Sequence, residues 1–221
     1  MLKRVFILML AAAGLVAAPY ASAETQWYVN GGLGFNAVAS DVVDFDPAAP
    51  PAENSTAGKS NFTGQIEGGA RFAMPNDDNI IFGIGLYINP FTLKADDINN
   101  NAGFSMATEI VDMRGLVGEV GWKLGASTVA YGKLSLNQAK VEVKINDVVD
   151  GISGTLTQDF SGVGFGAGVR QALANNMYLF TEWHHIMGST VTVNMGLIEP
   201  GATHKIKPKL TTGLIGAGWT F

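Results

Sequence analysis

The chain contains no cysteine, and this absence excludes several kinds of chemistry. Without a thiol, none of its 221 residues can form a disulfide, a thiolate metal site or a cysteine nucleophile. Exported proteins that need no disulfide are compatible with such a composition.

Basic residues are also scarce, because 14 Lys and Arg stand against 19 Asp and Glu. The basic residues are dispersed along the chain and form no single stripe. A chain with this balance repels phosphates, so the sequence excludes nucleic acid as a partner.

Long apolar runs are absent after residue 24. Before it, Lys3 and Arg4 precede an apolar stretch over residues 5–18, and residues 21–23 have the small-x-small form of a signal-peptidase site. The stretch is shorter than the roughly 20 apolar residues of a membrane-spanning helix. We therefore expect residues 1–23 to be a cleaved signal peptide and residues 24–221 to be the exported domain. That domain would carry 12 basic against 19 acidic residues, a net charge of −7.

Glycine and apolar residues are abundant, with 28 Gly, 47% hydrophobic residues and only 15% charged residues. Since no run has the length of a membrane helix, the apolar residues must be distributed over strands. In the last ten residues, one face collects Gly213, Ile215, Ala217, Trp219 and Phe221. Such a strand can place one face in lipid and the other in a packed interior.

Side chains at odd and even positions of a strand point to opposite faces, and we call each of these two sets a parity. Eight strands follow when the parity that contains the charged residues is assigned to the interior and the other parity to lipid. They cover residues 26–36, 61–73, 79–89, 106–120, 128–138, 161–171, 177–186 and 212–221. The fourth is the least regular, because Asp112 and Arg114 share the interior parity while Glu109 falls on the apolar one. We expect Glu109 at the membrane rim, where a carboxylate costs less than at the midplane.

The predicted connections alternate in length. The short ones are residues 75–78, 121–127 and 172–176, and the long ones are residues 37–60, 90–105, 139–160 and 187–209. Short periplasmic turns with long extracellular loops are typical of membrane barrels. The sequence therefore predicts an all-β fold, an eight-stranded antiparallel up-and-down transmembrane β-barrel.

Four features together resemble the small eight-stranded outer-membrane barrels of Gram-negative bacteria, such as the OmpA-type barrel domain and the opacity-like surface proteins. They are the leader, the opening Trp27-Tyr28-Val29, the pair Glu182-Trp183 and the terminal Phe221. The resemblance implies a place in the cell outer membrane, in contact with lipid and lipopolysaccharide. It also implies that the barrel-assembly machinery reads Trp219 and Phe221.

Charged residues on the interior parity form a predicted lumen cluster drawn from five strands. Its members are Glu67, Arg71, Asp112, Arg114, Lys133, Arg170 and Glu182. The lumen of an eight-stranded barrel has room only for side chains and trapped water, so these charges must pair. A structural plug is the favoured interpretation, and a gated ion path is the alternative.

Other motifs give weaker signals. Glycines at every second position of residues 162–168 lack the strand-to-helix context of a nucleotide site, so no cofactor is expected. Some small outer-membrane barrels are lipid A deacylases that use His, Ser and Glu, but the spacing of His184, His185 and Ser189 does not match theirs. Adjacent histidines on a strand face opposite ways, which argues against a metal site. We expect no enzyme.

The basic residues Lys205, Lys207 and Lys209 precede the last strand. Two interpretations of these lysines are equally favoured: they contact lipopolysaccharide phosphates, or they are simply solvated. The function that we predict is a structural or surface-interaction role, with the long loops available to an extracellular ligand. A narrow pore or transporter for ions or small apolar molecules is the alternative, and a lipid A-modifying enzyme is a third.

Overall fold

The computed structural model describes residues 25–45, 54–74, 77–99, 104–147, 151–194 and 203–221. The predicted signal peptide, residues 1–23, lies outside these ranges. In the described part of the chain, no helix is long and apolar enough to cross a membrane.

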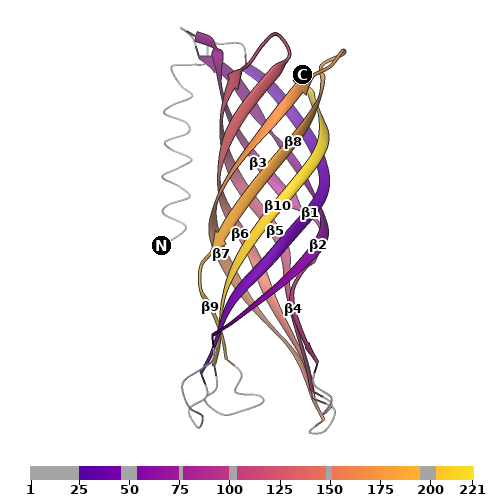
Figure 1. Ribbon diagram of the computed structural model, residues 1–221, viewed down its shortest axis with the longest axis vertical. Helices are drawn as coiled ribbons and strands as arrows, with labels where there is room; N and C mark the ends of the chain where they lie inside the picture. Colours follow the sequence, from indigo (N-terminus) through magenta and orange to yellow (C-terminus); the bar gives the residue numbers. More distant parts are fainter. Residues whose placement is uncertain (1–24, 46–53, 75–76, 100–103, 148–150, 195–202) are drawn as a thin grey trace.

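Ten antiparallel strands make up the fold (Figure 1). They are β1 (Thr25–Phe45), β2 (Asn54–Met74), β3 (Asp77–Asn89), β4 (Leu93–Asn99), β5 (Phe104–Lys123), β6 (Thr128–Asp147), β7 (Ile152–Ala172), β8 (Met177–Gly188), β9 (Val191–Asn194) and β10 (Thr203–Thr220). Eight of them pair in the order β1-β2-β3-β5-β6-β7-β8-β10, and β10 pairs back with β1. The sheet is therefore a closed cylinder, and the predicted eight-stranded barrel is confirmed.

The end of the barrel that holds Phe221 carries an apolar belt on its outside. The belt consists of exposed side chains such as Leu33, Leu86, Leu134 and Ile215. Trp27, Trp122 and Trp219 are exposed near its periplasmic edge. A hydrocarbon layer with an aromatic girdle at the interface requires this arrangement.

Glycines inside the belt give space to aromatic side chains. A Cβ added to Gly168 would lie 2.5 Å from the Tyr131 ring, and one added to Gly218 would collide with Tyr178. The alternating glycines of β7 therefore serve packing, as the spacing predicted.

The strands continue well beyond the belt. β1, β2 and β7 have 21 residues each, about twice the 9–11 residues that cross a bilayer. Along β6 the polarity reverses at residue 139. The inward side chains are Lys133, Ser135 and Asn137 within the belt, and Val141, Val143 and Ile145 beyond it. Outside the membrane the barrel is thus polar on its surface and apolar within.

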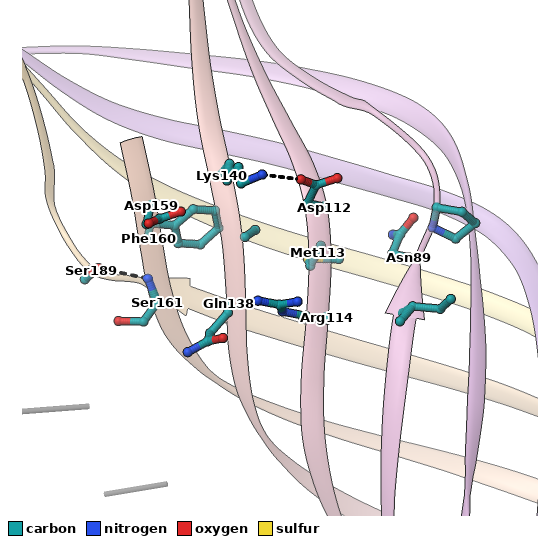
Figure 2. Close-up of a pocket in the computed structure, with 13 residues that line it drawn as sticks. Asn89, Asp112, Met113, Arg114, Gln138, Lys140, Asp159, Phe160, Ser161 and Ser189 are labelled. Carbon is teal, nitrogen blue, oxygen red and sulfur yellow. Dashed lines mark hydrogen bonds and ion pairs between the residues drawn. The ribbon is translucent and has the colours of Figure 1, made fainter. Parts of the chain in front are cut away.

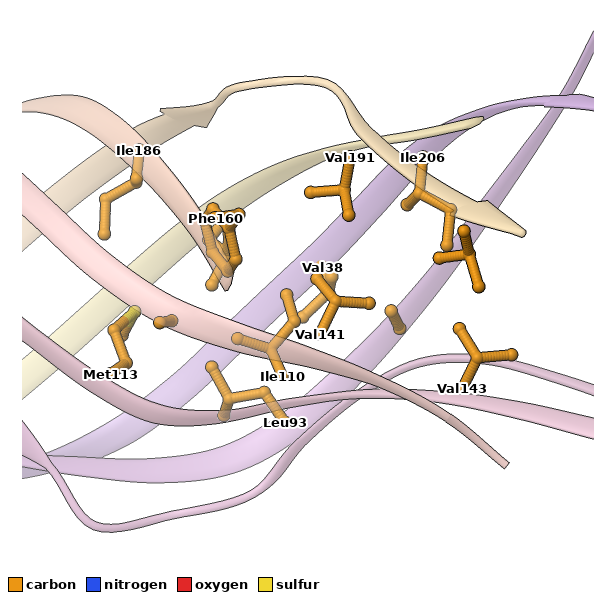
Figure 3. Packing of buried hydrophobic residues seen from close by; sticks show 14 of the residues in the cluster. Val38, Leu93, Ile110, Met113, Val141, Val143, Phe160, Ile186, Val191 and Ile206 are labelled. Carbon is orange, nitrogen blue, oxygen red and sulfur yellow. The ribbon is translucent and has the colours of Figure 1, made fainter. Parts of the chain in front are cut away.

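This outer part divides into two four-stranded sheets that face each other, and we call it the outer sandwich (bottom of Figure 1). One sheet has the order β2-β1-β10-β9 and the other β4-β5-β6-β7. An apolar core fills the space between them (Figure 3). Its members include Val38, Val193, Ile206 and Leu210 from the first sheet, and Leu93, Ile110, Met113, Val141 and Phe160 from the second.

Two seams separate the sheets, one between β2 and β4 and the other between β7 and β9. No ladder of strand pairing crosses either seam in the described residues. At the first seam, the Asn61 side chain accepts from the Lys94 amide and donates to its carbonyl, both at 2.9 Å. At the second, the Ser189 amide donates to the Ser161 carbonyl at 2.7 Å.

The long loops predicted at residues 37–60, 90–105, 139–160 and 187–209 are largely strands instead, and this correction has a physical reason. The parity rule assumed that apolar side chains face lipid. Beyond the membrane the polar side chains face outward, so the rule no longer recognises a strand there.

Candidate functional site: the charged lumen

Six charged side chains fill the lumen at the level of the belt. The acids are Glu67 of β2, Glu119 of β5 and Glu182 of β8, and the bases are Arg71 of β2, Lys133 of β6 and Arg170 of β7. All six are at most 6% exposed. Because the two signs are equal in number, the cluster is electrically neutral when every member is charged.

Lys133 bridges the lumen. Its Nζ lies 2.7 Å from Glu67 Oε2 and 2.6 Å from Glu182 Oε2, so one ammonium joins strands on different sides of the barrel. Tyr28 donates to Glu67 at 2.7 Å, and Tyr131 donates to Glu182 at 3.0 Å. Each carboxylate is thereby hydrogen-bonded as well as paired, as a buried ion pair requires.

A second group lies around Glu119. Its carboxylate pairs with Arg170 and, at 3.4 Å, with Arg71. Arg71 also lies over the Tyr28 ring, 3.7 Å from its centroid, and donates to the Tyr178 hydroxyl at 3.1 Å. These contacts connect β1, β2, β5, β7 and β8 across the lumen.

Uncharged polar side chains form hydrogen-bonded pairs in the lumen, between the charged cluster and the outer sandwich. Tyr87 donates to Asn137, and Ser135 Oγ lies 2.8 Å from His184 Nε2. Asn89 donates to Thr63 at 2.8 Å. Beyond these pairs begins the apolar core of the outer sandwich, so two different kinds of packing occupy the interior in succession.

Five of the seven residues predicted for the lumen cluster lie there, and Asp112 and Arg114 do not. In β5 two residues stand opposite one residue of β6, between the pairs Val111–Lys140 and Arg114–Gln138. Asp112 has a positive φ of 55° at this bulge. The extra residue reverses the parity of β5, so both side chains are exposed on the outside.

The same bulge explains why the sequence pattern does not predict Glu119 as a lumen residue. Beyond the bulge, Val117 and Glu119 point inward, although the predicted parity assigned odd-numbered positions of β5 to lipid. The neighbouring glycines at 115 and 121 were the available signal, because glycine also lines the lumen face of β7.

Outside the belt, exposed charges of β5 and β6 pair with one another. Lys140 Nζ lies 2.6 Å from Asp112 Oδ2, and this hydrogen bond lowers the pKa of Asp112 and raises that of Lys140. Glu109 faces outward and pairs with Lys144 at 2.6 Å, beyond the rim position expected for it.

The residues of the deacylase alternative are separated. His184 faces the lumen and contacts Ser135, whereas His185 faces outward and lies 2.8 Å from Thr211 Oγ1. Ser189 accepts from the Ser161 amide at the second seam. No group of three potential metal ligands occurs in the described ranges.

The remaining predicted residues lie on β10 and at its end. Lys205 and Lys207 are exposed and Lys209 is partly exposed, all on the outward face of a strand and not in a loop. Trp219 is 47% exposed and Phe221 is 72% exposed. Phe221 exchanges two backbone hydrogen bonds with Trp27, at 2.9 and 3.1 Å, which closes the barrel at its periplasmic end.

Comparison with known proteins agrees with this architecture. The family described as outer membrane protein beta-barrel domain matches residues 6–221. The outer membrane protein OprG from Pseudomonas aeruginosa is similar over 90% of this chain and 97% of its own, with 14% identity and a TM-score of 0.61. A major outer membrane protein from Thermus thermophilus is similar over 90% and 100%, with 13% identity and a TM-score of 0.54. No curated protein sequence matches the chain.

Proposed function

Because the chain belongs to the outer membrane protein β-barrel family, we propose that this integral protein of the Gram-negative outer membrane has a structural or surface-interaction role and a plugged lumen. The observation that carries the proposal is the bridge from Lys133 to Glu67 and Glu182, with the apolar core of the outer sandwich beyond it. An ion would have to break a buried pair and then cross an apolar layer. The rigid cylinder therefore serves to hold the outer sandwich above the membrane.

Conductance across planar lipid bilayers tests the plug. We expect the full-length mature protein to give no conductance steps at neutral pH. In Lys133→Ala, Glu67 and Glu182 lose their shared cation, but the apolar core of the outer sandwich still closes the path, so we expect at most small and rare cation-selective steps. Lys144→Ala removes an exposed pair outside the belt and is the matched control. Steps of equal size in the unaltered protein and in Lys133→Ala would contradict a plugged lumen.

The surface most suited to a partner is the free edge of β7 in the outer sandwich. Residues Ser153–Asp159 are exposed on both faces of the strand, apart from half-buried Leu156, and pair in the described residues with β6 alone. This segment contains neither Lys nor Pro, the residues that commonly protect an edge strand from further pairing. An extended segment of an extracellular protein can add to such an edge through backbone hydrogen bonds.

Membrane geometry favours a foreign segment over a second copy of the chain. Two copies in one membrane have the same orientation, and barrel strands tilt by about 35–45°. Two copies related by a twofold axis along the membrane normal would face each other with their β7 edges tilted in opposite directions. The two edges would therefore cross at an angle and could not pair side by side in a backbone ladder.

The direction of the backbone groups gives a sharp test. Ser161 directs its amide and carbonyl toward Ser189, so Thr157, four residues earlier on a regular strand, directs its amide to the same edge. Random 12-residue peptides displayed on phage can be selected against the protein in lipid nanodiscs. We expect Thr157→Pro to weaken the selected peptides at least tenfold and Thr157→Val, which keeps the amide, to preserve binding. Equal binding to both variants would exclude this edge.

Transport of small apolar molecules is the second candidate, since the two seams give access to an apolar core. The Ser189–Ser161 contact suits a Ser161→Cys/Ser189→Cys pair, and no native thiol competes with it. For a transporter, oxidation of this pair would slow the uptake of the apolar dye N-phenylnaphthylamine by cells. For the structural role, we expect uptake that is independent of the cross-link.

Two sets of exposed side chains supply further proposed contacts. Lys205, Lys207 and Lys209 form a basic row above the membrane that can meet lipopolysaccharide phosphates. Trp219 and Phe221 lie at the closing strand, where the barrel-assembly machinery would read them. The Ser135–His184 pair is buried in the packed lumen, which supports a structural and not a catalytic part for it.

A further inference from the structure

A hollow of about 560 Å³ lies in the barrel wall at the outer edge of the apolar belt (Figure 2). It begins where β3 ends at Asn89 and extends across β5, β6 and β7 to Ser189. Its lining includes Met113 and Phe160, whose side chains point inward into the apolar core. Outward-facing polar and charged side chains surround it, including Asp112, Arg114, Gln138, Lys140 and Asp159.

The hollow lies at the height of the lipid headgroups. Ile88, the strand partner of Arg114, is an exposed apolar residue of the belt. On the other side of Arg114, the exposed Asp112–Lys140 pair stands outside the belt. Arg114 thus marks the boundary between hydrocarbon and the polar zone of the outer leaflet.

Arg114 has no hydrogen bond or ion pair to any residue that the structure describes, and its side chain lies beside Gln138 (Figure 2). The acids of the hollow lie nearest Lys140, which pairs with Asp112 and is the strand partner of Asp159, whereas Arg114 acts on Asp112 only through its charge. Two carboxylates around one ammonium leave a net negative charge on the outer side. The hollow therefore presents a cation toward the lipid and an excess of acid toward the solvent.

The β5 bulge creates this arrangement. Without the extra residue, Arg114 would point into the lumen. The left-handed backbone at Asp112 costs most residues other than glycine roughly 1–2 kcal/mol, and Asp and Asn are the side chains that tolerate it best. Sequences at functional sites often retain such local strain, so the bulge is a second observation that directs attention to the same place.

We propose that this hollow binds the phosphoethanolamine headgroup of a membrane lipid. In such a lipid the phosphate lies nearer the acyl chains and the ammonium lies nearer the solvent. The phosphate accepts from Arg114 and Gln138, and the ammonium meets the acid excess of Asp112 and Asp159. An acyl chain lies along the exposed apolar surface at Ile88.

Native mass spectrometry of the protein released from nanodiscs tests the proposal. The nanodiscs contain equal amounts of phosphatidylethanolamine and phosphatidylglycerol. Each of these lipids carries one phosphate with one negative charge, so they differ only in the group attached to that phosphate. We expect at least threefold more bound phosphatidylethanolamine than phosphatidylglycerol. Arg114→Gln should reduce the bound phosphatidylethanolamine at least fivefold, whereas Lys144→Gln, a charge change outside the belt, should leave it unchanged.

Asp159→Asn separates a zwitterion site from a general anion site. We expect it to abolish the preference for phosphatidylethanolamine while phosphatidylglycerol binding is kept or increased. Soluble phosphoethanolamine is then added to the protein in detergent, and native mass spectrometry shows whether it forms an adduct. This measurement distinguishes a free solute from a lipid as the source of the phosphoethanolamine group. Lipid binding without a soluble adduct supports a lipid ligand. Equal lipid retention by Arg114→Gln and the unaltered protein, or no preference between the two lipids, would overturn the proposal.

Discussion

Lys133 is the residue on which the lumen network depends most. One ammonium pairs with two carboxylates, Glu67 of β2 and Glu182 of β8. Its removal leaves two like charges buried near each other with no shared cation. A buried charge without a partner is far more costly than the complete pair is favourable.

We predict that Lys133→Met lowers the free energy of unfolding by about 3–5 kcal/mol. Urea unfolding in lipid vesicles, followed by tryptophan fluorescence, measures this change. The triple variant Lys133→Met/Glu67→Gln/Glu182→Gln should regain part of the loss, because no buried charge of this group remains, although Arg71 and Arg170 then outnumber Glu119. The exposed Lys144→Met should have little effect, and a loss equal to that of Lys133→Met would contradict the argument.

At the scale of a single element, the β5 bulge determines which side chains face the lumen. It places Glu119 inside and Arg114 outside by inserting one residue near Asp112. Parity arguments count residues, and one unpaired residue changes every assignment beyond it. The five residues of the predicted cluster that the structure places inside the lumen lie on β2, β6, β7 and β8. In these strands the inward-facing positions stay all odd or all even along the membrane part.

The backbone of Asp112 gives a prediction about the bulge itself. Asp112→Gly relieves the left-handed backbone but loses the pair with Lys140, and Asp112→Asn keeps a residue type that tolerates positive φ. We expect Asp112→Val to be less stable than either by roughly 1–2 kcal/mol, because a β-branched residue is disfavoured at this φ. Urea unfolding again provides the measurement, and equal stability of all three variants would show that the backbone there is not left-handed.

The β2–β4 seam depends on side chains where a sheet would use a backbone ladder. Asn61 makes both the donor and the acceptor contact to Lys94. We predict that Asn61→Ala increases amide hydrogen exchange at Lys94 roughly tenfold, the equivalent of one hydrogen bond of about 1.4 kcal/mol. Asn146→Ala, an exposed change on β6, is the control and should leave that amide unaffected. Unchanged exchange in Asn61→Ala would mean that β4 is held by β5 alone.

At the scale of the whole molecule, the protein has two interiors of opposite character. Within the membrane the wall is apolar outside and charged inside, and in the outer sandwich the polarity is reversed. The sequence predicted the first region because lipid imposes one clear alternation on each strand. It did not predict the second, since Val141, Val143 and Ile145 alternate with Lys140, Glu142 and Lys144 in the opposite sense. Alternation alone does not say whether the apolar face meets lipid or a core.

The reversal also limits where function can reside. Since paired charges fill the lumen and an apolar core fills the outer sandwich, the surfaces that we propose for function within the described residues are the exposed β7 edge, the lysine row of β10 and the hollow at Arg114. All of these face the outer leaflet or the cell exterior.

Thiol accessibility inside the barrel tests the closed interior most directly. Ser135 is 3% exposed, and the absence of native cysteine makes Ser135→Cys the single thiol in that variant. We predict that a small charged methanethiosulfonate reagent, added to outer membranes, modifies Lys144→Cys rapidly and Ser135→Cys only after the barrel is unfolded. Modification of both thiols at similar rates in the folded protein would mean that water and ions reach the lumen, and would contradict the plugged barrel.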